Sequence, residues 1–226
     1  MSFLKVTAAI VRKDLASELR SGEVFLSMLL FSLLLVLVFS FAFLGGGAAP
    51  ETAAAGVIWV TSSFAGILGI SRVWDREREA GGLAVMLLSP AGRPAVFVAK
   101  TAVLFVLLLL CAVFVVPLAG LLFEAPLTVA PARLTILLAL GILGQSMLGA
   151  FFGALMAKSR SRDLLFSIAI FPLLFPLLIA GVMGSAELFS DQPVRERVDL
   201  FTSLLLAYDA MILVISFWTF ERAVAD

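Results

Sequence analysis

Apolar and charged residues alternate in long blocks along this chain. Six windows contain no Asp, Glu, Lys or Arg, apart from one Asp in the last window. An apolar helix of about 20 residues crosses the roughly 30 Å of bilayer hydrocarbon, and lipid offers no partners for non-helical backbone. The pattern therefore predicts an all-α integral membrane protein with six transmembrane helices, in one domain covering residues 1–226. The windows are Val24–Leu44, Thr52–Ser71, Thr101–Phe123, Leu134–Ala157, Leu164–Gly184 and Leu200–Phe220.

Positive charge is distributed unevenly between the connections. Of the 16 Lys and Arg residues, 13 lie in the N-terminal segment, the second-to-third and fourth-to-fifth connections, and the C-terminal segment. Cytoplasmic loops of membrane proteins carry this excess of Lys and Arg. We therefore expect both termini in the cytoplasm, with the polar segment between the second and third windows on the same side.

Residues 2–20 form an expected helix before the first window. Its apolar stripe follows helical spacing, and basic residues lie away from it, which is typical of a helix lying in the membrane interface. Such a helix acts either as a membrane anchor or as an elbow that also braces a partner. The stripe consists of Leu4, Ala8, Val11, Leu15 and Leu19.

The polar insert "RVWDREREAGGLAVMLLSPAGR" covers residues 72–93. A helix over Asp75–Leu88 is expected to end at Ser89-Pro90, because proline disfavours helix in the residue before it. Its apolar face must lie on the membrane or in a groove of a soluble partner. A solvated loop with locally paired charges is the alternative. The face consists of Ala80, Leu83, Ala84 and Leu87.

Composition excludes several functions. The 226 residues are 62% apolar and 14% charged with zero net charge, so no nucleic-acid footprint is present. Histidine is absent, and the single Cys111 cannot form an intrachain disulfide or a thiolate metal cage. The string "GRPAVFVAKT" lacks the glycines of a phosphate-binding loop. If ATP drives this protein, another chain binds it.

Two small-residue and proline motifs mark the predicted spans. Pro172 and Pro176 remove backbone donors and predict either a static kink or a hinge in the fifth span. Gly149 and Gly153 form a GxxxG motif, which allows close helix packing and is a candidate homodimer seam.

One acidic residue, Asp209, falls near the middle of the sixth span. A charge there costs at least about 2.5 kcal/mol on insertion scales, so it requires a partner or a proton. A structural carboxyl bonded to Tyr208, Gln145 or backbone is one interpretation, and a functional intramembrane polar site formed by Asp209 and Gln145 is the other.

The segment "EREAGGLAVMLLSPAGRPAVFVAK" (residues 77–100) resembles the cytoplasmic connection of ABC transporter permeases of the second export class. In that class the connection carries the coupling helix that docks on the ATPase, and an N-terminal elbow precedes six spans. The resemblance implies an ATPase-docking role for ten residues, namely Asp75, Arg76, Glu77, Glu79, Gly81, Gly82, Leu83, Leu87, Ser89 and Pro90.

A narrower match concerns residues 56–77 and 158–186, with Gly56, Trp59 and the paired prolines. These segments resemble the CcmB family, heme exporter B permeases of bacterial cytochrome c maturation. The resemblance implies a multi-pass, non-enzymatic inner-membrane subunit that is homodimeric. Because histidine is absent, only Met, Cys or Tyr could ligate heme, so this chain itself is expected to bind no cofactor. ATP would bind a cytoplasmic CcmA-like ATPase. Heme would be handled by a CcmC-like protein with a small CcmD-like subunit, and ATP use would release a heme-loaded CcmE-like chaperone.

Two other functions compete with this expectation. One is a permease of the same class that exports a lipid, drug or other small amphiphile. The other is a membrane scaffold without a transport cycle. An intramembrane enzyme is disfavoured, because only Asp209 offers acid-base chemistry within the spans.

Overall fold

The computed structural model describes residues 3–43, 50–79, 93–156 and 162–223, and every regular element in these ranges is an α-helix. The helices are α1 (Phe3–Ser21), α2 (Glu23–Phe43), α3 (Pro50–Glu79), α5 (Arg93–Leu122), α6 (Pro131–Met156), α7 (Arg162–Phe189) and α8 (Arg195–Ala223).

Six of these helices, α2, α3 and α5 to α8, are long and apolar enough to cross a membrane. The predicted fold class, six transmembrane helices, is confirmed. Several helices extend beyond their predicted windows, and two of these differences bear on the site described below. The second spanning helix continues through the charged residues to Glu79, so residues 75–79 extend α3 and do not begin a separate helix. The third begins at Arg93, well before Thr101, because Lys100 is accommodated inside the protein.

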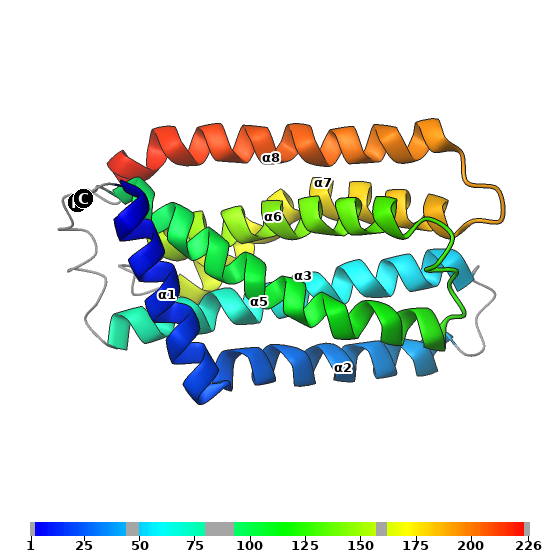
Figure 1. The fold of residues 1–226 in the computed structure, drawn as a ribbon, viewed down its shortest axis with the longest axis horizontal. Helices are drawn as coiled ribbons and strands as arrows, with labels where there is room; N and C mark the ends of the chain where they lie inside the picture. Colours follow the sequence, from blue (N-terminus) through cyan, green and yellow to red (C-terminus); the bar gives the residue numbers. More distant parts are fainter. Residues whose placement is uncertain (1–2, 44–49, 80–92, 157–161, 224–226) are drawn as a thin grey trace.

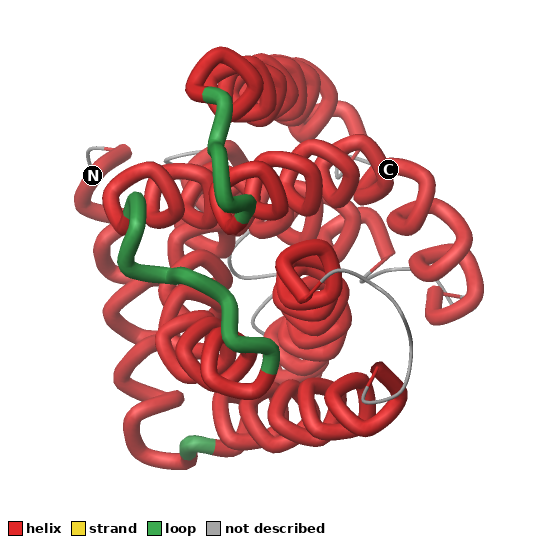
Figure 2. Tube along the Cα trace, turned by 90° about the vertical axis from the view of Figure 1, so that its right-hand side faces the viewer, coloured by secondary structure: helices red, strands yellow, loops and turns green. Residues whose placement is uncertain are grey.

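The spanning helices run side by side, with α2 and α8 on opposite edges of the bundle (Figure 1). Helix α2 packs on α3 and α5, whereas α8 packs mainly on α6 and α7. Figure 2 looks along the bundle at the end where short loops join α5 to α6 and α7 to α8. The helix α1 crosses the opposite end, where α3 ends and α5 begins (Figure 1).

A sharp turn at Gly22 redirects the chain from α1 into α2. Gly22 adopts a left-handed φ of 63°, a conformation that glycine adopts without steric cost. The face of α1 that packs on the bundle carries Val6, Ile10 and Glu18. The predicted apolar stripe is turned partly outward, since Leu4 is 75% and Leu19 89% exposed. These outward leucines fit an interfacial helix, which stays a prediction.

Trp59 occupies the centre of the half of the core near the short loops. Its indole Nε1 donates a hydrogen bond to Ser185 Oγ at 2.9 Å, so α3 and α7 are joined by a buried polar contact. Two glycines, Gly141 on α6 and Gly181 on α7, make room for the ring. A Cβ added to Gly141 would lie 2.1 Å from the ring, and one added to Gly181 would lie 2.4 Å from it.

The outer faces of α2 and α8 carry large apolar residues exposed on the surface of the chain, including Leu34, Phe41, Leu204 and Val214. In a soluble protein such continuous apolar faces would mark an interface. Here they are the expected lipid-facing surface of a six-helix membrane protein, and the apolar core lies between α3, α5, α6 and α7.

We expect Gly141→Ala to destabilise the fold, because its Cβ would overlap the Trp59 ring. Overpacking of this kind costs about 1–3 kcal/mol. Gly56→Ala is the matched control, since no atom lies within 4 Å of a Cβ added there. Denaturant unfolding in mixed micelles, followed by Trp fluorescence, should separate the two variants. Equal stability of both would contradict the packing described around Trp59.

Candidate functional site

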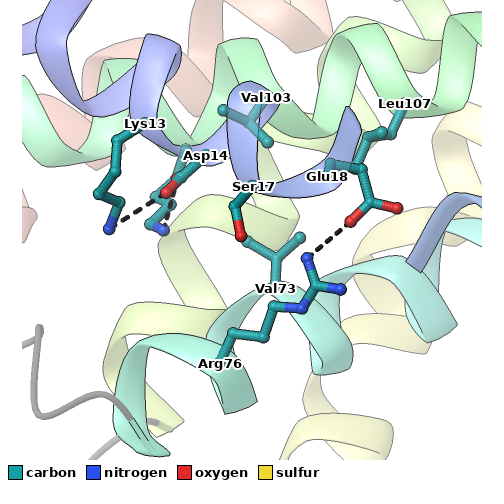
Figure 3. Close-up of a pocket in the computed structure, with 9 residues that line it drawn as sticks. Lys13, Asp14, Ser17, Glu18, Val73, Arg76, Val103 and Leu107 are labelled. Carbon is teal, nitrogen blue, oxygen red and sulfur yellow. Dashed lines mark hydrogen bonds and ion pairs between the residues drawn. The ribbon is translucent and has the colours of Figure 1, made fainter. Parts of the chain in front are cut away.

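A cavity of about 240 Å³ lies where α1 crosses α3 and α5. Its walls carry charged side chains from all three helices. Figure 3 shows Lys13 directed toward Asp14, and Arg76 directed toward Glu18. We call this region the α1 junction. Its lining residues are Lys13, Asp14, Ser17, Glu18, Val73, Arg76, Lys100, Val103 and Leu107.

Lys100 of α5 is fully buried at this junction. Its Nζ lies 2.7 Å from Asp14 Oδ2 on α1, and 5.6 Å from the centre of the Trp74 ring on α3. A buried ammonium group is tolerated only with a close counter-charge, and an aromatic face adds further attraction. One cation therefore joins α1, α3 and α5.

Arg76, in the last turns of α3, makes the second cross-link. Its Nη1 lies 2.7 Å from Glu18 Oε2, and its Nη2 donates to Ser21 Oγ at 2.7 Å. A longer contact of 3.5 Å reaches Glu23 at the beginning of α2. The other oxygen of Glu18 accepts the backbone N–H of Phe25 at 2.7 Å, which satisfies a free donor in the first turn of α2. Glu18 thus fixes the α1–α2 turn and the end of α3 together.

The positions of Asp14 and Glu18 follow from helix geometry. They are four residues apart, so they lie on one face of α1, and they continue the face formed by Val6 and Ile10. The apolar half of this face packs on the bundle, while the acidic half reaches Lys100 and Arg76. Helix α1 is therefore oriented by its acidic residues as well as by its apolar ones.

The ion pairs of α1 hold the two helices that flank the predicted docking segment. Helix α3 ends at Glu79 and α5 begins at Arg93, so these two helices flank residues 80–92. Helix α1 holds α3 near that end through Arg76, and holds α5 near its beginning through Lys100. The α1 junction therefore connects both attachment points of the predicted docking segment to one rigid helix.

Four of the ten predicted docking residues, Asp75, Arg76, Glu77 and Glu79, lie in the last turns of α3, and Arg76 bonds to Glu18 and Ser21 at the α1 junction. The other six lie outside the described residues. These are Gly81, Gly82, Leu83, Leu87, Ser89 and Pro90.

The predicted intramembrane polar residues do not bond to one another. Gln145 is fully buried, and its Nε2 donates to the carbonyl oxygens of Ser62 and Ser63, each at 3.1 Å, which joins α6 to α3. Tyr208 donates its hydroxyl to the carbonyl of Leu173. Asp209 is 4% exposed, and neither carboxyl oxygen has a hydrogen-bond partner in the described part of the chain.

Pro172 and Pro176 lie within the continuous helix α7. Leu173, whose carbonyl accepts the Tyr208 hydroxyl, lies between them, so α8 satisfies a backbone acceptor at the proline-disturbed turn. This hydrogen bond thus joins α8 to the turn of α7 that lies between the two prolines. A static kink and a hinge at Pro172 and Pro176 both stay predictions.

The GxxxG motif faces the interior of the chain. A Cβ added to Gly149 would meet Ile70 of α3 at 2.4 Å, and one added to Gly153 would meet Trp74 at 2.0 Å. Both glycines are buried in this way, so the motif is used to pack α6 on α3 and is not available as a homodimer seam.

Sequence reasoning missed Asp14 and Glu18 as site residues. Their signal was present: two acidic residues at helical spacing interrupt a basic, amphipathic segment. Lys100 falls directly before the third predicted window, Thr101–Phe123, where the sequence gives it no role in the site. Its burial could not be read from sequence, because nothing along the chain indicates which helix supplies the counter-charge.

Comparisons with known proteins show the family to which the chain belongs. The family model described as CcmB protein matches residues 5–225. Heme exporter protein B of Rhodobacter capsulatus is 30% identical over 175 residues, covering 76% of this chain and 79% of that protein. Heme exporter protein B of Paracoccus denitrificans is 29% identical over 173 residues, with the same coverage of 76% and 79%. The Bradyrhizobium diazoefficiens protein of that name is 26% identical over 178 residues, covering 79% and 80%.

We expect Asp14→Ala to lower stability strongly, because it removes the carboxylate that lies 2.7 Å from the buried ammonium group of Lys100. Removing one partner of a buried ion pair costs about 3–5 kcal/mol. Asp199→Ala removes a carboxylate from the exposed pair with Arg133, where less than about 1 kcal/mol is expected. Unfolding midpoints in mixed micelles compare the two, and similar losses would show that Lys100 does not depend on Asp14.

Proposed function

Since this chain belongs to the CcmB family of heme exporter permeases, we propose that it is the membrane subunit through which a separate ATPase acts on heme handling. The permease is a multi-pass transport protein of cytochrome c biogenesis. We propose further how ATP hydrolysis drives the permease. The segment after α3 binds a cytoplasmic CcmA-like ATPase, and the α1 junction transmits the movement of the ATPase to the spanning helices.

The observation that carries the proposal is the bracing of both ends of the docking segment. Arg76 near the end of α3 and Lys100 near the beginning of α5 are each ion-paired to α1 at 2.7 Å. A segment that received force from a partner would need such bracing, because an unbraced loop would absorb the displacement. The pairs join three helices and the α1–α2 turn, so a displacement of the segment would reach several spanning helices together.

Within the docking segment the roles differ by chemistry. Leu83 and Leu87 are four residues apart, a spacing that would place them on one face of a helix, and we assign them the apolar contact with the ATPase groove. Charged residues of the α3 end, Glu77 and Glu79 among them, form the polar rim. In the sequence, Gly81-Gly82 lies between the charged residues of the polar rim and the leucines of the apolar contact. Ser89-Pro90 marks the end of the docking segment before α5.

Heme is the cargo of the complex in this proposal, and partner proteins ligate it. Histidine is absent from the chain, and Cys111 is buried in the apolar core beside α5 residues such as Leu108. Without histidine, and with its single cysteine buried in the apolar core, the chain does not suit axial heme ligation. We assign heme binding to a CcmC-like protein with its small CcmD-like subunit, and the ATP-driven step to release of a heme-loaded CcmE-like chaperone. The permease works as a homodimer with two ATPase chains.

The proposed orientation in the bacterial inner membrane places both termini and the α1 junction in the cytoplasm. Its basis is the excess of Lys and Arg in the segments at that end. In a Cys111→Ala background, a membrane-impermeant maleimide should label single cysteines at Gly46 and Ser190 in intact cells. A cysteine at Ser161 should be labelled only after permeabilisation. Labelling of Ser161 in intact cells would reverse the orientation.

We expect Leu83→Asp to prevent ATPase binding. The variant loses an apolar contact worth roughly 1.5–3 kcal/mol and places a carboxylate in the groove. The six spans are unchanged, so the protein should still insert and accumulate. Co-purification of the ATPase with the membrane subunit measures the effect, and Ser190→Asp in the α7–α8 loop is the control. A normal ATPase yield with normal coupled activity in Leu83→Asp would exclude this segment as the docking element.

A further inference from the structure

A second cavity, about 450 Å³ in volume, lies between α5, α6 and α8. Its volume is within the range of sites for small organic ligands, about 300–1,000 Å³. The walls are almost entirely apolar and include Phe105 of α5, Met147 of α6 and Leu213 of α8. It shares no lining residue with the α1 junction.

Two polar side chains interrupt the apolar wall. Asp209 is 4% exposed and Thr101 is 8% exposed, and both line the cavity. Neither carboxyl oxygen of Asp209 nor the hydroxyl of Thr101 has a hydrogen-bond partner within the described ranges of the chain. A buried polar group without a partner is costly, and an acidic residue within a span is retained where it has a function.

The carboxyl of Asp209 is held in place by helix packing. It lies against Gly144 of α6, where an added Cβ would stand 2.3 Å from Oδ1. The Tyr208 hydroxyl donates to the Leu173 carbonyl and the Gln145 Nε2 donates to the α3 backbone, so neither of these two donors is bonded to the carboxyl. The carboxyl is therefore fixed at the cavity wall and available to a ligand.

The cavity reaches the surface of the bundle along α8. Leu206 and Leu213 line it and are 58% and 44% exposed. Helix α8 packs mainly on α6 and α7 and only marginally on α5, so the seam between α5 and α8 is the open side. Asp209 is at the midpoint of α8, which spans Arg195–Ala223, so this side faces the hydrocarbon of the bilayer. A ligand would enter from the lipid.

We infer that this cavity binds a lipid-like amphiphile with a protonated primary amine. The ammonium group donates to the carboxylate of Asp209 and to the hydroxyl of Thr101, and the hydrocarbon chain lies along Phe105 and Met147. An ionised carboxylate only accepts hydrogen bonds, so a cationic donor satisfies both its charge and its lone pairs. An anionic headgroup would be repelled. The site does not depend on ATPase docking, so either proposal can fail without the other.

The experiment uses the full chain in dodecyl maltoside with two photoactivatable probes of equal length. One is a diazirine-bearing hexadecyl amine, and the other is the corresponding alcohol. Cross-linked peptides are identified by mass spectrometry. We expect saturable labelling of α5 and α8 residues that line the cavity, with the amine preferred over the alcohol by about tenfold or more, as expected for hydrogen bonds to a charged group.

Asp209→Asn keeps the side-chain size and should abolish the preference for the amine, while Thr101→Val should reduce it. Asp199→Asn is the matched control, because it makes the same change on the same helix at an exposed carboxylate paired with Arg133. Equal labelling by amine and alcohol, labelling confined to the lipid-facing surface of α2, or a preference that survives Asp209→Asn would each overturn the inference.

Discussion

Lys100 is a fully buried cation near the beginning of a spanning helix, and the carboxylate of Asp14 at 2.7 Å makes this position stable. Much of the arrangement follows from that pair. Because the counter-charge comes from α1, that helix must cross α5 at this depth, and the chain must then turn sharply at Gly22 to enter α2. The same face of α1 carries Glu18, which brings Arg76 and the end of α3 into the junction. One buried charge thereby sets the relative positions of four helices.

The six spans could be predicted from sequence because a bilayer imposes a simple requirement: about 20 apolar residues in helical conformation. The residues at which the spans end were harder to predict from sequence. Residues 72–79 are strongly charged, which suggested a break after Ser71, yet α3 continues to Glu79 because Arg76 is neutralised by Glu18. For the same reason α5 begins before its lysine. A prediction from hydropathy alone places the end of a span at its first charged residue. In the folded chain, that charged residue can form an ion pair inside the protein, and the helix continues.

Polar contacts between helices were predicted less well than the helices themselves. The sequence identified Gln145 and Asp209 as unusual but could not determine their partners, which depend on how each helix is rotated about its axis. In the structure Gln145 joins α6 to α3, and Asp209 faces a cavity beside α5. The GxxxG motif illustrates the same limit. Its spacing permits close packing on any helix, and here the partner is α3 of the same chain.

Lys100 and Thr101 are consecutive in α5, so one turn of that helix borders both the α1 junction and the α5–α6–α8 cavity. The central claim is that the α1 junction transmits movement from an ATPase docked after α3. The direct test is ATP hydrolysis by the purified complex, normalised to bound ATPase, for Arg76→Glu, Glu18→Arg and the double exchange. The account predicts that each single reversal retains the ATPase but loses permease-dependent activity, and that the exchange restores part of it. A native rate in Arg76→Glu would contradict the account.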